Sequence, residues 1–261
     1  MIASEYISKQ QTLDNFIAVA GNVGSGKTTL LRILEKWLAD NIFPFKEPEV
    51  ENPYLAEQYQ AVKTQKANPG VLQSQLYFLS YKGKFLGEIS KKASELQKYQ
   101  HMWLDRTIYE DAEIFFQGLH DRGLVGGRGE LLYLNLYEAF LSLTPRPSIL
   151  FYVKADPAQC MERANKDRRR YESILPPGIE YYEDLHERYE SWINEFEFMQ
   201  KKLSNPTQIV PIDTNNVNLH TLEGQNQVLA LIRDTLVDKG LLYENIELPD
   251  KVLLPFKPKK S

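Results

Sequence analysis

An apolar run followed directly by a glycine-rich loop occupies residues 16–28, which read Phe-Ile-Ala-Val-Ala-Gly-Asn-Val-Gly-Ser-Gly-Lys-Thr. The part from Gly21 to Thr28 fits the pattern G-x-x-x-x-G-K-[ST]. A leucine-rich helical pattern follows it, so the loop has the strand before it and the helix after it that a phosphate-binding loop requires. The glycines let the backbone curl so that N–H groups point at phosphate oxygens, and the helix adds its positive N-terminal end.

This loop predicts the binding of a nucleoside triphosphate. Lys27 is expected to reach the β- and γ-phosphates, and the Thr28 hydroxyl to bind Mg²⁺. The alternative is a glycine-rich turn with a surface lysine, which the flanking strand and helix disfavour. The residues expected to contact the nucleotide here are Gly21, Asn22, Val23, Gly24, Ser25, Gly26, Lys27, Thr28 and Thr29.

The composition narrows the class of protein further. The chain has 261 residues, with 31 Lys and Arg against 35 Asp and Glu, and a formal net charge of −4. Proteins that coat nucleic acid need a basic excess for phosphate contacts, so we expect no nucleic-acid partner. The single cysteine, Cys160, excludes an intrachain disulfide and a cysteine-based zinc cluster within one chain, and it fits a reducing compartment.

The apolar segments of the chain are short. Residues 1–11 lack the cationic flank and long apolar run of a signal peptide, and no uninterrupted apolar segment approaches bilayer length. We therefore expect a cytoplasmic protein with no membrane partner.

Strand-like and helix-like patterns alternate along the whole chain. Apolar runs that predict strands lie at 16–20, 43–47, 101–104, 149–153 and 208–212, and helical spacing of apolar residues lies at 28–40, 73–99, 108–119, 181–202 and 219–239. This alternation predicts an α/β fold with a parallel sheet whose two faces are covered by helices. We expect one domain over 1–239 and an irregular C-terminal extension over 240–261, which holds three prolines.

Charged residues follow two of the predicted strands, at the sheet edge where such folds place their chemistry. Glu47, after the second strand, could accept a proton from a hydroxyl that attacks the γ-phosphate, although a glutamate before a proline is also common in solvated loops. Asp105 follows the third strand and could hold Mg²⁺ directly or through water, and Arg106 could clamp phosphate oxygens. The structural alternative is a helix N-cap by Asp105 and a surface arginine.

A cluster of basic residues follows the fourth strand. Arg163, Lys166, Arg168, Arg169 and Arg170 lie close together, and we expect an arginine-rich lid near 163–172 that closes over the triphosphate. A solvated charged helix face is the alternative.

Several segments in a fixed order resemble the deoxyribonucleoside kinases, with bacterial deoxyadenosine and deoxyguanosine kinases as the nearest type. They are the phosphate loop, Glu47-Pro48 with Asn52-Pro53-Tyr54-Leu55, Gln75-Leu-Tyr-Phe-Leu79, Asp105-Arg-Thr-Ile-Tyr-Glu-Asp111, Cys160-Met-Glu-Arg163, His186 and Ser191-Trp192. The resemblance implies a P-loop kinase-type three-layer fold with a five-stranded parallel sheet. It also implies an ATP-dependent enzyme that moves the γ-phosphate to the 5′-hydroxyl of a deoxynucleoside, with Mg²⁺.

The same resemblance implies roles for individual residues. Glu47 would be the general base, with Arg106 near the 5′-hydroxyl, and Tyr59 with Glu172 would bind the sugar 3′-hydroxyl. Gln75 would pair with the base, whose far end would meet the charged pair of Lys82 and Asp111. The residues implied to contact the nucleotide beyond the loop are Arg163, Arg168, Arg169 and Asp213.

The chain departs from the family pattern at three positions. Ser74 replaces a common Phe, Lys82 replaces a more usual Arg, and Asp167 stands where a lid arginine is common. The resemblance of these motifs to bacterial purine-type members favours deoxyadenosine or deoxyguanosine as substrate, with deoxycytidine behind, and Asp111 could accept a hydrogen bond from an exocyclic amino group. The family usually forms homodimers, and the apolar positions that could serve a dimer or equally the core are Leu131, Leu132, Leu134, Leu136 and Phe140.

Three other functions remain as alternatives. A thymidylate-kinase-like enzyme shares the loop, a Glu-Pro and an Asp-Arg, but needs further basic groups for an acceptor phosphate. A non-catalytic structural relative should have lost the lysine of the loop or the charged residues at the strand ends, which are all present. A GTPase would need an Asn-Lys-x-Asp segment, and Asn165-Lys166-Asp167 lacks the spacer.

Overall fold

A five-stranded parallel sheet forms the centre of the protein, as the sequence predicts. The computed structural model describes residues 4–45, 52–166 and 178–254. The strands are β1 (Thr12–Ala20), β2 (Ile42–Phe45), β3 (His101–Asp105), β4 (Arg146–Lys154) and β5 (Gln208–Asp213), in the spatial order β2-β3-β1-β4-β5. All four pairings are parallel, so the carboxyl ends of the strands share one edge.

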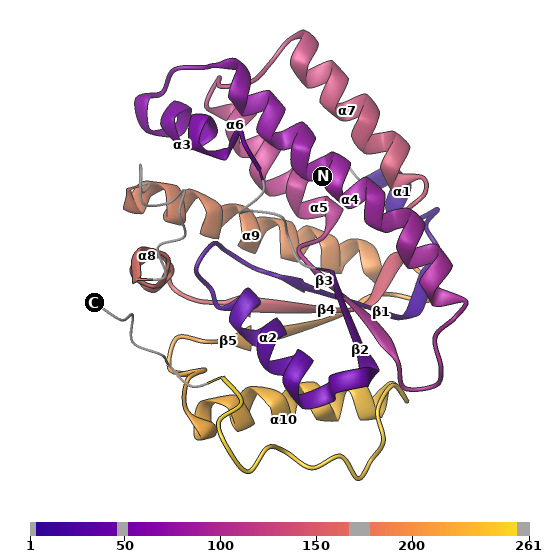
Figure 1. Ribbon diagram of the computed structural model, residues 1–261. Helices are drawn as coiled ribbons and strands as arrows, with labels where there is room; N and C mark the ends of the chain where they lie inside the picture. Colours follow the sequence, from indigo (N-terminus) through magenta and orange to yellow (C-terminus); the bar gives the residue numbers. More distant parts are fainter. Residues whose placement is uncertain (1–3, 46–51, 167–177, 255–261) are drawn as a thin grey trace.

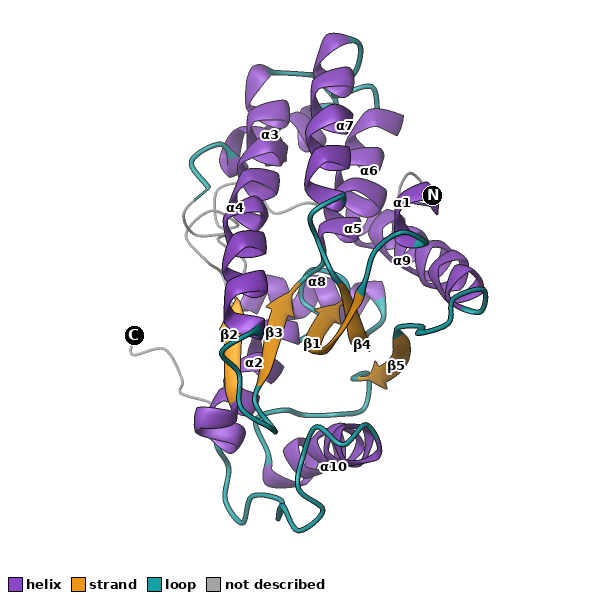
Figure 2. Cartoon of the chain, turned by 90° about the vertical axis from the view of Figure 1, so that its right-hand side faces the viewer, coloured by secondary structure: helices purple, strands orange, loops and turns teal. Residues whose placement is uncertain are grey.

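Helices cover both faces of the sheet and make three layers (Figures 1 and 2). On one face lie α3 (Leu55–Thr64), α4 (Pro69–Ala93), α5 (Ile108–Glu110), α6 (Gln117–Asp121), α7 (Arg128–Leu141) and α9 (Ile179–Gln200). On the other lie α2 (Lys27–Leu38) and α10 (Leu222–Asp238). The remaining pieces are α1 (Ser4–Ile7), α8 (Pro157–Lys166), a 3₁₀ turn at Ala39–Asn41 and a π-helical stretch at Asp111–Phe116.

Strand β1 shows how one apolar run supplies two cores. Phe16, Ala18 and Ala20 lie in the core beneath α4 and α9, whereas Ile17 and Val19 lie in the core beneath α2 and α10. Successive side chains of a strand point to opposite faces, so a strand buried on both sides must be apolar throughout.

The helices differ from the sequence prediction in several places. The pattern at 73–99 forms α4, which begins at Pro69, a residue suited to a first helical turn, and ends at Ala93. The pattern at 108–119 forms α5 and α6 with the π-helical stretch between them. Helices α3, α7 and α8 were not predicted, and α3 and α8 are short and rich in polar residues.

The C-terminal extension lies along α2 and α10 from 240 to 254, without helix or strand. The Trp37 Nε1 donates to the carbonyl of Glu247 over 3.0 Å, and the Lys36 Nζ to the carbonyl of Leu253 over 2.8 Å. Leu242 is buried in the core beneath α2 and α10. These contacts hold the extension against the helix that follows the phosphate loop.

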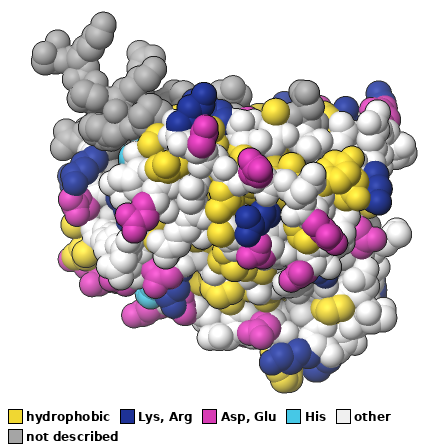
Figure 3. Space-filling view, turned by 90° about the horizontal axis from the view of Figure 1, so that it is seen from below, with side chains coloured by type: hydrophobic (Ala, Val, Ile, Leu, Met, Phe, Trp, Pro, Cys, Tyr) yellow, Lys and Arg dark blue, Asp and Glu magenta, His cyan; other side chains and the backbone are white. Residues whose placement is uncertain are grey.

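On the underside of the molecule, basic and acidic side chains are interspersed around a group of hydrophobic ones (Figure 3). Within the described ranges, no helix is both long enough and apolar enough to cross a bilayer.

Candidate active site

The loop between β1 and α2 is packed too tightly for side chains at two of its glycines. Gly21 and Gly24 have φ values of 143° and 77°. A Cβ on Gly21 would lie 2.2 Å from the carbonyl oxygen of Val153, and one on Gly24 would lie 2.1 Å from that of Cys160. The loop is thus pressed against the end of β4 and the first turn of α8, in a curled conformation that only glycine adopts easily.

The polar groups of this loop suit a polyphosphate. The Lys27 side chain is only 5% exposed, and its Nζ donates to the carbonyl of Asn22 over 2.7 Å. The buried hydroxyl of Ser25 has no hydrogen-bond partner among the described residues. The N-terminus of α2 has no side-chain cap. The loop therefore gathers a lysine, a hydroxyl and the N–H groups of a helix start, which is the donor set that phosphate oxygens need.

Thr28 and Asp105 meet beside the loop. The Thr28 Oγ1 donates to Oδ2 of Asp105 over 3.3 Å, and Asp105 is buried at the end of β3. Among the described residues there is no group of three or more His, Cys, Asp or Glu that could hold a metal. Mg²⁺ at phosphates usually takes one or two protein oxygens, with phosphate and water completing its shell, so this pair fits Mg²⁺.

Arg106 sits in a strained turn directly after β3. Its φ is 63°, and its backbone N–H donates to the carbonyl of Val19 over 3.0 Å. The side chain is 2% exposed, lies over the ring of Phe115 at 4.6 Å, and donates through NH1 to the hydroxyl of Tyr189 over 3.1 Å. A left-handed arginine persists only where its surroundings hold it, and such strain concentrates at functional sites.

Glu110 joins this arginine to the phosphate loop through Tyr189, a role that the sequence does not predict. Its Oε1 accepts from the Gly21 N–H over 3.3 Å and from the Tyr189 hydroxyl over 2.8 Å, and its Oε2 accepts from the Thr107 N–H over 2.6 Å. Burial raises the pKa of Glu110, while Arg106 and the Thr107 N–H act to lower it. The signal in the sequence is the T-x-x-E spacing of a capping box, which Thr107 and Glu110 form.

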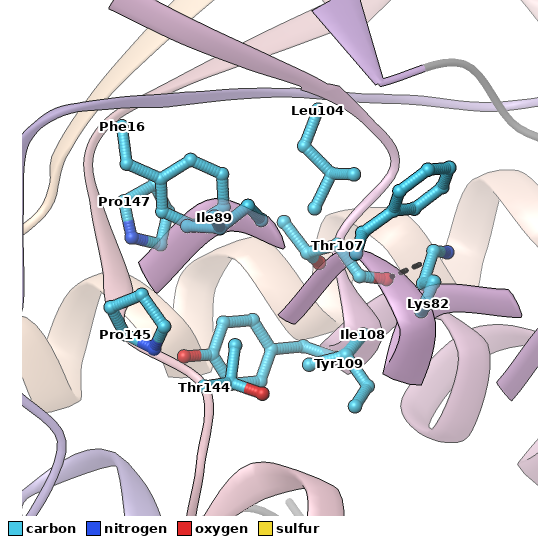
Figure 4. Close-up of a pocket in the computed structure, with 11 residues that line it drawn as sticks. Phe16, Lys82, Ile89, Leu104, Thr107, Ile108, Tyr109, Thr144, Pro145 and Pro147 are labelled. Atoms are coloured by element: carbon cyan, nitrogen blue, oxygen red, sulfur yellow. Dashed lines mark hydrogen bonds between the residues drawn. The ribbon is translucent and has the colours of Figure 1, made fainter. Parts of the chain in front are cut away.

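Lys82 and Asp111 form a buried ion pair, as the family pattern implies. The Lys82 Nζ lies 2.7 Å from Oδ1 of Asp111 and also donates to the carbonyl of Thr107 over 3.3 Å. Figure 4 shows Lys82 and Thr107 beside a small pocket that is otherwise lined mostly by apolar side chains such as Leu104 and Ile89. A buried charge needs such a partner, so the pair fixes both side chains.

Tyr59 and Gln75 lie on α3 and α4. The Gln75 Nε2 donates to Oε1 of Gln58 over 2.8 Å, and the ring of Tyr59 meets that of Tyr181 edge-on at 6.4 Å. Tyr181 lies in the first turn of α9, and the carbonyl of the next residue accepts from the Asn22 side chain of the phosphate loop over 3.0 Å. Helix α9 therefore connects the α3 region with the loop.

Arg163 and Asp213 lie near the loop but are engaged elsewhere. Arg163 donates through NH1 to the Thr214 hydroxyl over 3.0 Å and through NH2 to the Thr214 carbonyl over 2.7 Å. The same hydroxyl is 3.0 Å from the carbonyl of Ser25. Asp213 is exposed and accepts from the N–H of Asn215 over 2.8 Å. Contacts of both residues with a nucleotide remain predictions.

Four predicted site residues lie outside the described residues, namely Glu47, Arg168, Arg169 and Glu172. The structure brings together the phosphate loop, Asp105, Arg106 and the Lys82–Asp111 pair, and it connects Tyr59 and Gln75 to them through α9 and α3.

The family model described as deoxynucleoside kinase matches residues 17–238. The chain belongs to the deoxynucleoside kinase family. It is thus an ATP-dependent kinase of deoxynucleosides, which agrees with the resemblance seen in the sequence. The match disfavours the thymidylate-kinase-like, non-catalytic and GTPase alternatives.

Relatives of this deoxynucleoside kinase include the deoxyadenosine/deoxycytidine kinase of Bacillus subtilis, which is 32% identical over 70% of this chain and 78% of its own. The deoxyguanosine kinase of Dictyostelium discoideum is 29% identical over 80% of this chain and 67% of its own. A structure of deoxyadenosine kinase from M. mycoides, with dCMP and a flexible dCDP bound, superposes with a TM-score of 0.65 at 26% identity. The superposition covers 85% of this chain and 99% of the M. mycoides chain.

Proposed function

We propose that this kinase transfers the γ-phosphate of ATP to the 5′-hydroxyl of a purine deoxynucleoside, deoxyadenosine or deoxyguanosine. The observation that carries the proposal is the contact between the phosphate loop and the segment that follows β3. Glu110, in the segment after β3, accepts a hydrogen bond from the first N–H of the phosphate loop, and Thr28 of the loop bonds to Asp105. Hydrogen bonds thus connect two parts of the site. One is the loop that would hold the donor phosphates, and the other is the turn at Arg106 that would hold the acceptor.

Transfer of this kind depends on positioning and on stabilising charge rather than on a covalent intermediate. Lys27 and the loop N–H groups hold the β- and γ-phosphates, and Arg106 stabilises the charge that develops near the 5′-oxygen. Glu47 takes the proton of the 5′-hydroxyl as that oxygen attacks phosphorus. Mg²⁺, held by Thr28 and Asp105, neutralises phosphate charge when it is bound. Arg163, Arg168, Arg169 and Asp213 remain the predicted outer contacts of the nucleotide.

The acceptor nucleoside is proposed to lie along α3 and α4. Tyr59 and Glu172 bind the 3′-hydroxyl, and a tyrosine packed there crowds a 2′-hydroxyl. Gln75 pairs with the base through its amide, which carries both donors and an acceptor. Asp111, held by Lys82, accepts from an exocyclic amino group. The purine preference is supported by the deoxyguanosine and deoxyadenosine kinases of Dictyostelium discoideum among the relatives, beside the deoxyadenosine/deoxycytidine kinase of Bacillus subtilis.

A homodimer is proposed to form through α7. Leu131, Leu132 and Leu136 on this helix are 61%, 47% and 38% exposed. Leu134 and Phe140, which the sequence left open between core and interface, pack partly against the core beneath α4 and α9. An exposed group of leucines on one helix is typical of a contact surface. A cytoplasmic location stays a prediction from the sequence, with which the single cysteine agrees.

The catalytic proposal is tested by Glu47→Gln. We expect kcat for deoxyadenosine to fall by at least about 100-fold, the lower range for general-base catalysis, while Mg·ATP still binds in calorimetry. Glu49→Gln, two residues away, is the matched control and should keep its turnover. Near wild-type turnover in Glu47→Gln would remove Glu47 from the role of base.

A further inference from the structure

Two glutamines on neighbouring helices hydrogen-bond to each other where the base is proposed to bind. Gln58 on α3 is 4% exposed and Gln75 on α4 is 2% exposed, and the Gln75 Nε2 donates to Oε1 of Gln58 over 2.8 Å. A second polar bond joins the segment before α3 to α4, from the Asn52 Nδ2 to Oγ of Ser74 over 3.0 Å. The two helices are therefore held in a fixed register around Gln75.

The bond to Gln58 restricts what Gln75 can offer a ligand. A primary amide has two N–H donors and one carbonyl acceptor, which a half-turn about the last side-chain bond exchanges. In the observed arrangement one N–H of Gln75 is directed to Gln58. The carbonyl oxygen of Gln58 faces the amide of Gln75. A half-turn of that amide would bring the Gln75 Oε1 against the Gln58 Oε1, and two carbonyl oxygens repel each other. One N–H and the Oε1 of Gln75 remain for a base, in one fixed order.

A second acceptor lies along the same face of α4. Lys82 is seven residues beyond Gln75, so both side chains leave α4 on one side, about two turns apart. Lys82 holds Oδ1 of Asp111 at 2.7 Å. A carboxylate has about four lone-pair sites on its two oxygens, so Asp111 can accept from more than one donor at a time. A group that lies between Gln75 and Asp111 therefore meets two acceptors.

We propose that Gln58 is a positioning residue that makes the enzyme select deoxynucleosides with an amino group next to an unprotonated ring nitrogen, as in adenine and cytosine. The inference rests on the proposed function, in which Gln75 contacts the base. The amino group donates to Gln75 Oε1 and to Asp111, and the ring nitrogen accepts the remaining N–H of Gln75. An oxo base with a ring N–H, such as hypoxanthine, guanine or thymine, places its oxygen against the acceptors and its ring N–H against the donor. Of the two purines in the proposed function, the inference therefore selects adenine over guanine.

The sharpest test compares deoxyadenosine with 2′-deoxyinosine, which differ only in this edge of the base. Burying one unpaired polar group lowers kcat/KM by about 10- to 100-fold. We expect the full-length wild-type enzyme with Mg·ATP to prefer deoxyadenosine by at least about 10-fold. Gln58→Met has a similar shape but no acceptor, so Gln75 can turn, and the preference should fall towards one. Gln58→Glu only accepts, so it should keep the preference.

A control separates selectivity from stability. Gln60 is exposed on the same helix, and Gln60→Met should leave the kcat/KM ratio unchanged. Thermal unfolding of each variant shows whether the fold is intact. A folded, active Gln58→Met enzyme with the wild-type ratio would overturn the inference and leave the proposed function standing. A wild-type preference for deoxyinosine would also overturn it.

Two further outcomes have defined meanings. If Gln58→Met does not fold, the wild type and Gln58→Glu still test the inference. Both must favour deoxyadenosine over 2′-deoxyinosine by at least about 10-fold. If no deoxynucleoside is phosphorylated by the wild type, the proposed function and the inference both fall.

Discussion

The hydroxyl of Tyr189 on α9 donates to Oε1 of Glu110 over 2.8 Å and accepts from NH1 of Arg106 over 3.1 Å. Because Glu110 also accepts from the first N–H of the phosphate loop, this one hydroxyl connects the loop to the arginine that follows β3. The three side chains are buried, so the low dielectric strengthens these bonds and makes a missing partner costly.

Tyr189→Phe removes this hydroxyl and keeps the ring. We expect the free energy of unfolding to fall by about 1–3 kcal/mol, because Arg106 and Glu110 each lose a partner. Turnover should fall by about 10-fold or more as Arg106 loses its fixed position. Chemical denaturation and steady-state kinetics measure the two effects.

The control is Tyr133→Phe. The buried Tyr133 hydroxyl has no hydrogen-bond partner among the described residues, so this variant should be as stable as wild type. Equal behaviour of the two variants would contradict the account.

Gly24→Ala tests the packing of the phosphate loop. The new Cβ would lie 2.1 Å from the carbonyl oxygen of Cys160, at a φ of 77° that alanine rarely adopts. The loop must shift, so we expect calorimetry with Mg·ATP to show binding weakened by at least about 10-fold. Gly126→Ala, where the Cβ meets open space, should bind as wild type does. Unchanged ATP affinity in Gly24→Ala would mean that this loop does not hold the triphosphate.

His101 links stability to pH. Its Nδ1 accepts from the Trp103 Nε1 over 3.1 Å and its Nε2 lies 2.9 Å from the carbonyl of Leu241, so the neutral ring protonated at Nε2 satisfies both. Burial lowers the pKa of His101 below its ordinary value. The unfolded chain therefore binds the proton first, and stability falls as pH drops below about 6.5, by at most about 1.4 kcal/mol per pH unit.

The measurement is urea denaturation from pH 7.5 to 5.5. His101→Gln should show a shallower loss of stability across this range than wild type. Identical slopes for His101→Gln and wild type would show that His101 is not the group responsible.

Cys160 should be chemically inert in the folded protein. Burial raises the pKa of its thiol to about 11, although Lys27 and Arg163 act to lower it. At pH 8 only about one thiol in a thousand is then ionised, and the thiolate is the reactive form. Because the chain has one cysteine, reaction with Ellman's reagent reports this site alone. We expect labelling in urea to be at least about 100-fold faster than in buffer. Equal rates would show an accessible thiol.

The parts of the site that the sequence predicts are those built from neighbouring residues. The phosphate loop is one continuous segment between a strand and a helix, and Asp105 follows its strand directly, so local chemistry is enough. Helices α3, α7 and α8 were not predicted, and the polar composition of α3 and α8 gives little helical periodicity.

Side-chain networks between distant segments could not be predicted in the same way. Tyr189 meets Glu110 across 79 positions of the chain, and Arg163 meets Thr214 across 51. The first makes Glu110 part of the site, and the second engages an arginine that the sequence assigned to the nucleotide. Both depend on which helices pack together, and that packing is a property of the whole core.

The most direct test of the account is transfer of labelled γ-phosphate from Mg·ATP to a panel of four deoxynucleosides, their ribose counterparts and dTMP. We predict a labelled 5′-monophosphate from a purine deoxynucleoside, with deoxyadenosine ahead of deoxyguanosine if Gln58 positions Gln75 as inferred, and with the ribonucleosides and dTMP phosphorylated far more slowly. Transfer to dTMP alone, or to no member of the panel, would contradict it.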